Sequence, residues 1–366
     1  MKNEEKINSF GLCTNVIALS GASFYGIYSS YILNTAKTST LIAMLIGYLL
    51  STIFTTIILN FFKTKPELSL AQKMKYIYNK SSFLVNILFS ICTLSIYIFM
   101  TYRLTSFICS QYLVETSKKL VLLAVLFCTF NITSKGIETT TRVSTLSFYV
   151  AIFIFIFDIL ALFNQIEIDN YLPITNFNLK DIAKASFVFA LYFSVPTVNI
   201  YACKFNQISD KDNFTKYFTF AHLFSLLILF LSIGTTLGVL GIELCNIFDY
   251  PLYTVLKKIS LFKFIESFEN VSIMLWVIYI INATSISLLC TFNILKDTLN
   301  LKNKSFKYMK YLLFIIAFFI PTIFFMDNTF IDSLEYVWLP ASLTMLVLLV
   351  ITISLILIKI KNKLNK

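Results

Sequence analysis

Charged residues are scarce in this sequence, and histidine is almost absent. Only 13% of the 366 residues are charged, 57% are hydrophobic, and the one histidine is His222. This balance excludes a soluble domain and indicates a polytopic membrane protein. One histidine cannot supply a histidine-based metal cluster or catalytic triad, and no GxSxG, P-loop or HExxH motif is present. We therefore expect neither an enzyme nor a bound metal or cofactor.

Paired cysteines and dense basic clusters are lacking as well. The seven cysteines are scattered singly without a CxxC spacing, so the sequence predicts no disulfide and no metal site. The net charge of +11 arises from lysines in short segments between apolar stretches, which is typical of membrane orientation. The sequence thus predicts a lipid bilayer, and not nucleic acid, as its partner.

Apolar stretches recur along the whole chain. A membrane-spanning helix needs about 20 apolar residues, and on this measure the sequence predicts an all-α fold of ten transmembrane helices. We expect them in a single integral membrane domain, residues 1–366. Their expected bounds are 10–32, 39–62, 83–108, 119–134, 143–163, 182–202, 217–241, 269–292, 309–326 and 337–360.

The distribution of lysine and arginine predicts the orientation. If the N-terminus is cytoplasmic, 21 of the 30 basic residues fall in cytoplasmic segments and 8 fall in outside loops. Such a bias favours the side with the excess as the cytoplasmic one. We therefore expect both termini in the cytoplasm and an even number of spans.

Two of the apolar stretches have small or polar residues at their centres. Ile182–Cys203 carries Ser194 and Pro196, and a helix must kink or break at a proline that has no N–H. The first stretch, Phe10–Ile32, has the small residues Ser20–Ser23 at its centre. A broken helix near the bilayer midplane indicates a transporter-type binding site; an ordinary kinked helix is the alternative.

These stretches are the first and the sixth of the ten. The spans then divide into two repeats of five, at about 10–163 and 182–360. This is the arrangement of LeuT-type inverted-repeat transporters, in which helices 1 and 6 are broken around the substrate.

Four segments resemble the endospore germination permeases, the B subunits of spore nutrient-germinant receptors. Lys65–Lys80 contains PELSL and YIYNK, and Arg103 followed by Phe107 is similar to the end of their third helix. Lys135–Arg142 reads KGIETTTR, which resembles their GIE…R signature. Tyr250–Trp276 combines an aromatic–Pro pair, a short amphipathic helix and a tryptophan, as theirs does.

The resemblance implies membership of the amino acid–polyamine–organocation superfamily. It further implies a subunit in the spore inner membrane that assembles with an A-type and a C-type partner. Such a subunit would sense a small nutrient, an amino acid above all, and signal ion release. The scarcity of glycine and the SVPT centre of the sixth stretch depart from the pattern expected of that superfamily.

A zwitterionic amino acid needs hydrogen-bond donors for its carboxylate and acceptors for its ammonium. Broken helices supply both, through half-helix N-termini and unwound carbonyls. Helix packing by small residues is the alternative role of such positions. The substrate-binding positions expected on this basis are Gly21, Ala22 and Ser23 in the first stretch and Ser194, Val195, Pro196 and Thr197 in the sixth.

Further polar residues lie inside other stretches. In a LeuT-type arrangement, Tyr97 and Thr101 of the third stretch and Asn282 and Ser285 of the eighth would face the substrate; hydrogen bonding within the bundle is the alternative. Asp158 is an acid among apolar residues, which makes it a candidate for proton or cation coupling. It lies near the outer end of its stretch, so contact with the interface is the competing interpretation.

Three functions remain open at this point. The first is a ligand-sensing receptor subunit, and the second is a free-standing amino acid permease coupled to protons or cations. The third is a scaffold subunit that keeps the fold and binds nothing. Only a permease accumulates its ligand, and only a receptor depends on partner subunits for its response.

Overall fold

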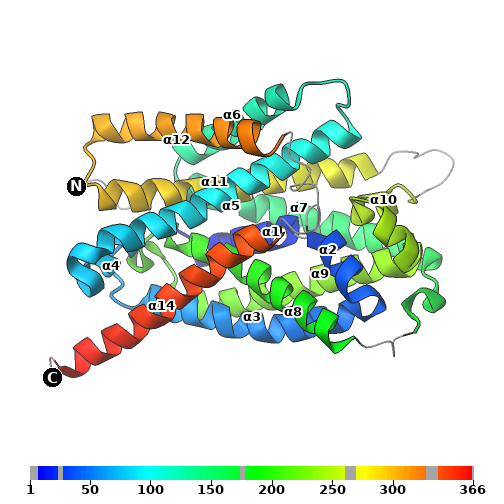
Figure 1. Cartoon of the computed structure of the whole chain (residues 1–366), viewed down its shortest axis with the longest axis horizontal. Helices are drawn as coiled ribbons and strands as arrows, with labels where there is room; N and C mark the ends of the chain where they lie inside the picture. Colours follow the sequence, from blue (N-terminus) through cyan, green and yellow to red (C-terminus); the bar gives the residue numbers. More distant parts are fainter. Residues whose placement is uncertain (1–6, 24–27, 174–177, 260–268, 327–336, 365–366) are drawn as a thin grey trace.

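The computed structural model describes residues 7–23, 28–173, 178–259, 269–326 and 337–364, which are helical apart from turns and one isolated bridge between Ile7 and Ile208 (Figure 1). The α-helices are α1 (Ser9–Ser23), α2 (Ser29–Ala36), α3 (Thr40–Lys63), α4 (Leu70–Tyr78), α5 (Ser82–Gln111), α6 (Lys118–Ser134), α7 (Ile137–Leu162), α8 (Leu179–Ser194), α9 (Lys211–Ile247), α10 (Pro251–Leu256), α11 (Glu269–Thr298), α12 (Asn303–Phe324) and α14 (Trp338–Leu364). Short 3-10 segments are η2 (Lys37–Ser39), η3 (Asn79–Ser81), η4 (Phe163–Gln165), η5 (Ile168–Tyr171), η6 (Val195–Ala202) and η7 (Phe205–Gln207).

Eight helical segments in the described part of the chain are long and apolar enough to cross a membrane. Two of the ten expected spans fall short of that length. The first is divided into α1 and α2, and residues 24–27 between them lie outside the described residues. The fourth is α6, whose 17 residues are fewer than the roughly 20 that a bilayer requires. Eight of the ten expected spans are thus present as long apolar helices in the described part of the chain.

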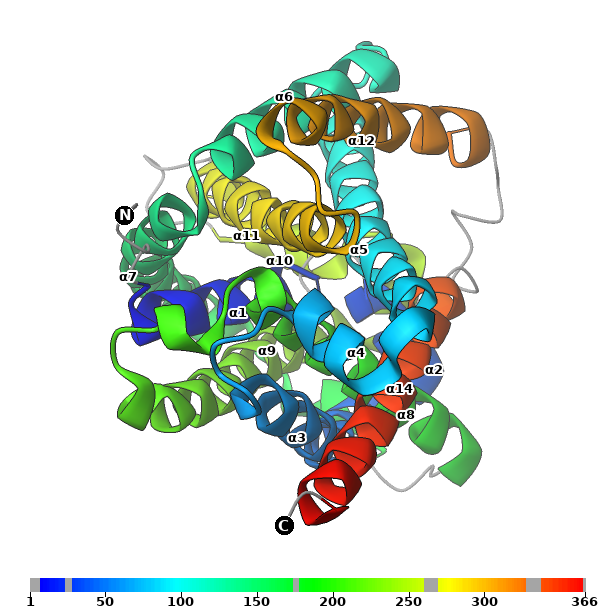
Figure 2. The same cartoon turned by 90° about the vertical axis from the view of Figure 1, so that its left-hand side faces the viewer.

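Helix α1 lies at the centre of the bundle. It packs against α7, α9 and α11 and also contacts η6, and Figure 2 shows it surrounded by these elements. A central position suits its sequence, because buried side chains such as Leu12 and Asn15 occur all around the helix. Any ligand that reaches α1 must therefore lie inside the bundle.

Helices α3 and α8 approach each other closely at Gly47. A Cβ atom at this position would lie 2.6 Å from the backbone oxygen of Ser186 and 2.9 Å from the Phe189 ring. Only glycine allows this approach, which brings α8 and the following η6 into the core.

The winding of the chain changes where Pro196 was expected to disturb it. The α-helix α8 ends at Ser194, and Val195–Ala202 continue as a 3-10 helix with Pro196 in its first turn. Runs of 3-10 helix longer than four residues are uncommon, because their hydrogen bonds are poorly aligned. The backbone at Pro196 therefore remains helical, but it changes from α-helical to 3-10 geometry.

Helix α4 begins directly after Ser69. Ser69 is its N-cap and forms a reciprocal capping box with Gln72. Behind it, the buried ammonium group of Lys73 donates a 2.6 Å hydrogen bond to the Phe62 carbonyl at the end of α3. This lysine therefore caps α3 and fixes α4 against the bundle.

Candidate functional site

A cavity of about 110 Å³ lies between the end of α1 and helices α7, α9 and α11. Its wall is mostly aromatic and aliphatic, and its few polar groups are a carboxylate and hydroxyls. A small, largely apolar hollow with few polar groups is what a small-molecule site requires. The lining residues are Gly21, Phe148, Ala151, Ile152, Ile154, Phe155, Asp158, Ser225, Ile228, Leu229, Ser272, Leu275, Trp276 and Tyr279.

Asp158 is the one acid in that wall, and it is only 6% exposed. Its Oδ1 accepts a 2.9 Å hydrogen bond from the Ser272 hydroxyl. Between residues that the structure describes, the single ion pair joins Arg142 to Glu138, so no described basic side chain neutralises this carboxylate. A buried charge without a counterion is costly. The site is therefore electrostatically suited to a cation.

A second, smaller hollow of about 20 Å³ also borders Asp158. Its wall includes Ser232, Thr235 and Thr236 of α9, which carry hydroxyl groups. In the described part of the chain, the buried Ser232 hydroxyl has no hydrogen-bond partner. Asp158 thus borders two hollows, and the smaller one has three hydroxyl-bearing residues in its wall.

Gly21 leaves space in the larger cavity. A Cβ added to Gly21 would meet no atom within 4 Å. The residue lies two positions before the end of α1 at Ser23. The C-terminal end of a helix carries partial negative charge, so α1 adds to the field of Asp158 and also favours a cation.

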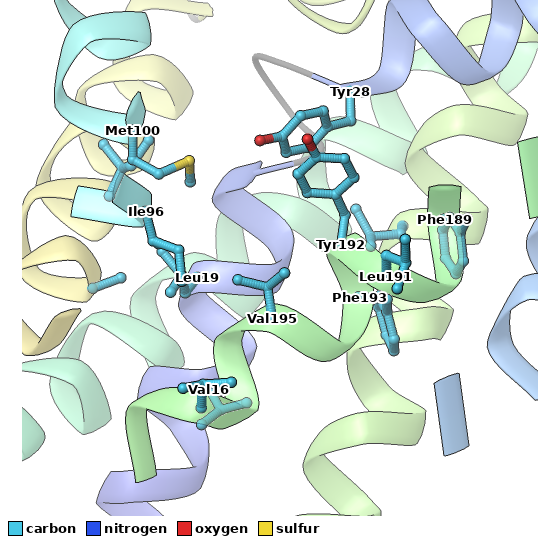
Figure 3. Close-up of a cluster of buried hydrophobic side chains, with 14 of the residues drawn as sticks. Val16, Leu19, Tyr28, Ile96, Met100, Phe189, Leu191, Tyr192, Phe193 and Val195 are labelled. Carbon is cyan, nitrogen blue, oxygen red and sulfur yellow. The ribbon is translucent and has the colours of Figure 1, made fainter. Parts of the chain in front are cut away.

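Unlike Gly21, the predicted positions in the sixth stretch lie elsewhere, in a packed region. Figure 3 shows apolar side chains of α1, α5 and the α8–η6 segment meeting there, with Val195 among them. The rings of Tyr28 and Tyr192 stack with centroids 3.6 Å apart. This packing closes the region between α1 and η6.

The polar side chains near this cluster have different environments. Ser194 donates a 2.5 Å hydrogen bond to the Ala190 carbonyl, within its own helix. Pro196 is buried, and Thr197 is fully buried with a hydroxyl that has no partner. The side chains of Ala22 and Ser23 lie outside the described residues.

Tyr97, Thr101 and Ser285 bond within the bundle. The Tyr97 hydroxyl is 2.7 Å from the Thr129 hydroxyl on α6, so Tyr97 faces away from the cavity beside α1. The Thr101 hydroxyl donates to the Tyr97 carbonyl, and the Ser285 hydroxyl donates to the Ile281 carbonyl. Each acceptor lies four residues earlier in the same helix. The Tyr97–Thr129 contact joins α5 to α6, whereas these bonds of Thr101 and Ser285 lie within their own helices.

Asn282 belongs to a polar network that includes α1. Its amide donates to the Ser144 hydroxyl at 2.6 Å, and Asn15 of α1 donates to the same hydroxyl at 2.7 Å. Ser144 in turn donates to the Thr140 carbonyl at 3.0 Å. The Asn282 Oδ1 atom is buried without a partner. The network connects α1, α7 and α11 and leaves one acceptor available.

Sequence reasoning did not single out Asn15, Ser144 and Asn199. Asn199 lies in η6, where its amide donates a 2.8 Å hydrogen bond to the Ser287 hydroxyl and its Oδ1 has no partner. An asparagine inside an apolar stretch was the available signal for Asn15 and Asn199, because a buried amide must find partners in the bundle.

Comparison with known proteins decides the family. A family model described as spore germination protein matches residues 16–331. The chain belongs to the spore germination protein family. The resemblance seen in the sequence is thereby confirmed, and the chain is a transporter-like membrane protein of a kind that is typically not an enzyme. No curated protein matches this spore germination protein in sequence.

Solved structures of transporters share its fold. Mhp1, a nucleobase-cation-symport-1 family transporter in a closed conformation with bromovinylhydantoin bound, matches with a TM-score of 0.64 and 13% identity, over 93% of this chain and 78% of that one. Two variants of the Eremococcus coleocola manganese transporter match with TM-scores of 0.56 and 0.53 at 11% and 12% identity, each over 97% of this chain and 81% of theirs. The spore germination protein is thus a multi-pass membrane protein that resembles LeuT-fold transporters.

Proposed function

We propose that this spore germination protein is the transporter-like subunit of a germinant receptor, which senses a small nutrient and helps to trigger germination. The observation that carries the proposal is the cavity beside α1, where Asp158 is buried without a counterion. The nutrient class that fits best is an amino acid, because its ammonium group suits this carboxylate. The partners are A-type and C-type receptor subunits, as the family implies.

In this proposal Asp158 holds the ammonium group, and the end of α1 adds its negative field. The hydroxyls of Ser225 and Ser272 orient the nutrient, and Trp276 covers its apolar part. The residues at the helix breaks, Gly21–Ser23 and Ser194–Thr197, form the part of the bundle that rearranges on binding.

The proposed architecture has two five-helix repeats, about 10–163 and 182–360, in one integral membrane domain of ten spans. Helices 1 and 6 are the broken ones: α1 with α2, and α8 with η6. Family membership supports a location in the spore inner membrane, and the lysine distribution favours cytoplasmic positions for both termini. Tyr97, Thr101, Asn282 and Ser285 support the pocket from α5 and α11.

A free-standing permease is the alternative. The fold shared with transporters favours it, and Asp158 would then bind the coupling proton or cation. In that case the nutrient would bind at the helix breaks, between α1 and η6, after the packed cluster there had opened.

Germination and uptake distinguish the two functions. Spores that lack this chain are exposed to single amino acids, and uptake of the same amino acids is measured in parallel, with the restored gene as control. We expect loss of the response to one nutrient with unchanged uptake. Normal germination with reduced uptake of one amino acid would make the protein a permease.

A further inference from the structure

A polar cleft of about 560 Å³ lies at the end of the molecule that Figure 2 faces, between α4, the start of α5 and the end of α11. Three lysines line it, Lys75, Lys80 and Lys296, against a single acid, Asp297. It is separate from the cavity beside α1, and no step of nutrient sensing uses it.

Among the residues that the structure describes, no carboxylate forms an ion pair with the lysines of this cleft. The only ion pair in the described part of the chain lies elsewhere, between Arg142 and Glu138. Asp297 is engaged by the Ser69 hydroxyl at 2.5 Å, which ties the N-cap of α4 to the end of α11. The cleft therefore presents an excess of positive charge to whatever fills it.

The cleft also offers hydrogen-bond acceptors. Asn86 is 3% exposed and lines the cleft, and its amide nitrogen donates a long 3.4 Å hydrogen bond to the Ala71 carbonyl. Its Oδ1 has no partner. A buried acceptor without a donor costs free energy, so the occupant should carry a hydroxyl or N–H group beside its negative charge.

The rim of the cleft continues onto the apolar surface of a membrane span. Phe83, which lines the cleft, is 48% exposed, and the next residue, Leu84, is 72% exposed. Both lie in the first turn of α5, where a head group in the cleft would meet its own acyl chains. A soluble anion makes no use of this surface, whereas a phospholipid fits both parts.

We propose that this cleft binds the head group of an anionic phospholipid, with the phosphate on Lys75, Lys80 and Lys296. Head-group hydroxyls donate to Asn86 Oδ1 and to Asp297. Phosphatidylglycerol has this chemistry: one negative charge and two hydroxyl donors. Phosphatidylcholine has the same phosphate but no donor and no net charge.

The experiment compares these two lipids on the purified full-length chain in detergent. Bound lipid is counted by native mass spectrometry, and thermal unfolding is followed in parallel. The test variant is Lys75→Gln with Lys80→Gln, two exposed lysines that line the cleft. The control is Lys304→Gln with Lys307→Gln, two exposed lysines of α12 outside the cleft that remove the same charge.

We expect retained phosphatidylglycerol, but not phosphatidylcholine, on the wild-type chain and on the control. In the test variant its affinity should fall roughly thirtyfold, since each lysine at a lipid surface contributes measurably to anionic lipid binding. Unchanged unfolding in phosphatidylcholine would show that the test variant is folded.

Several results would overturn the proposal. Equal losses in both variants would show general surface attraction, and no loss in either would place the lipid elsewhere. Displacement of the lipid by millimolar inorganic phosphate would identify a site for a free anion. Binding of a polyglutamate peptide in preference to phosphatidylglycerol would identify a contact with an acidic partner protein.

Discussion

Asp158 combines burial, charge and a cavity in one residue. A carboxylate that is 6% exposed and bonded only to a hydroxyl gains most from a ligand that brings positive charge. Its neighbours Trp276 and Phe155 are apolar, and low polarity around a charge strengthens such an attraction. We therefore expect the proposed nutrient recognition to depend on this side chain more than on any other.

The substitution Asp158→Asn keeps the shape and removes the charge. We expect the nutrient concentration for half-maximal germination to rise at least about thirtyfold, as for loss of one partner of a buried ion pair. Germination curves over a range of nutrient concentrations measure this. Asp169→Asn, the same change at an exposed residue of η5, serves as the control. An unshifted curve for Asp158→Asn would remove the carboxylate from nutrient recognition.

Gly21 allows the volume of the cavity to be reduced without a clash. In Gly21→Ala the added methyl group meets no protein atom within 4 Å, so it occupies ligand space. We expect roughly tenfold weaker nutrient response, since one methyl group in a pocket changes affinity by that order. Gly234→Ala is the matched control, because its Cβ would meet only Leu41 at 3.8 Å. Equal responses of the two variants would place the nutrient outside this cavity.

At the scale of elements, α1 is held by polar as well as apolar contacts. Asn15 and Asn282 share the hydroxyl of Ser144, so three helices meet at one atom. In a membrane, interhelical hydrogen bonds add modest free energy but fix how helices are rotated against each other. The network therefore sets which face of α1 borders the cavity.

The contact between α3 and α8 has no room for a side chain. In Gly47→Ala the new methyl group would lie 2.6 Å from a backbone oxygen of α8, so the two helices must separate. We expect a loss of about 1–3 kcal/mol in stability, as for overpacking elsewhere, visible as a lower unfolding temperature of the purified protein. Gly234→Ala should unfold like the wild type. A Gly47→Ala protein as stable as the wild type would mean that α3 and α8 are farther apart than described.

Several elements follow directly from the sequence, and the exceptions have physical reasons. Pro196 locates the change of winding at Ser194, because the missing N–H is a local property. The start of α4 has a local signal as well, since Ser69 and Gln72 form a capping box. The cavity could not be predicted as a whole. Gly21 and Asp158 were each singled out, but their meeting depends on how α1 packs against α7.

At the scale of the whole molecule, the lysine bias makes a prediction about orientation. The two lysine-rich connections, before α5 and before α12, lie at the same end of the molecule as the final turns of α14 (Figure 1). We expect epitope tags at both termini to be protected from protease in intact protoplasts and cleaved in inverted vesicles. A tag placed after Lys257, in an outside loop, should behave oppositely. Termini on opposite sides would require an odd number of spans.

The sequence predicts the overall fold better than it predicts the lengths of the spans and the contacts between them. Hydropathy alone indicates a helical membrane protein, and short motifs such as KGIETTTR indicate the family. Span lengths are less predictable, because α6 is shortened by the turn at Gly136, whose φ of 88° suits only glycine well. Contacts between distant helices, such as Asn15 with Ser144, leave no trace in local sequence patterns.

The central place of α1 has a consequence for how the protein is made. Helix α1 is synthesised before its neighbours α7, α9 and α11, which all begin at or after residue 137. At about 5–20 residues per second, α1 waits on the order of 6–25 s before the first of them is made. The 2.9 Å hydrogen bond from the Ile7 backbone N–H to the Gln207 carbonyl forms later still. The ribosome thus synthesises the central helix before the helices that pack around it. Until α7 is made, the membrane or its insertion machinery must accommodate the polar side chain of Asn15.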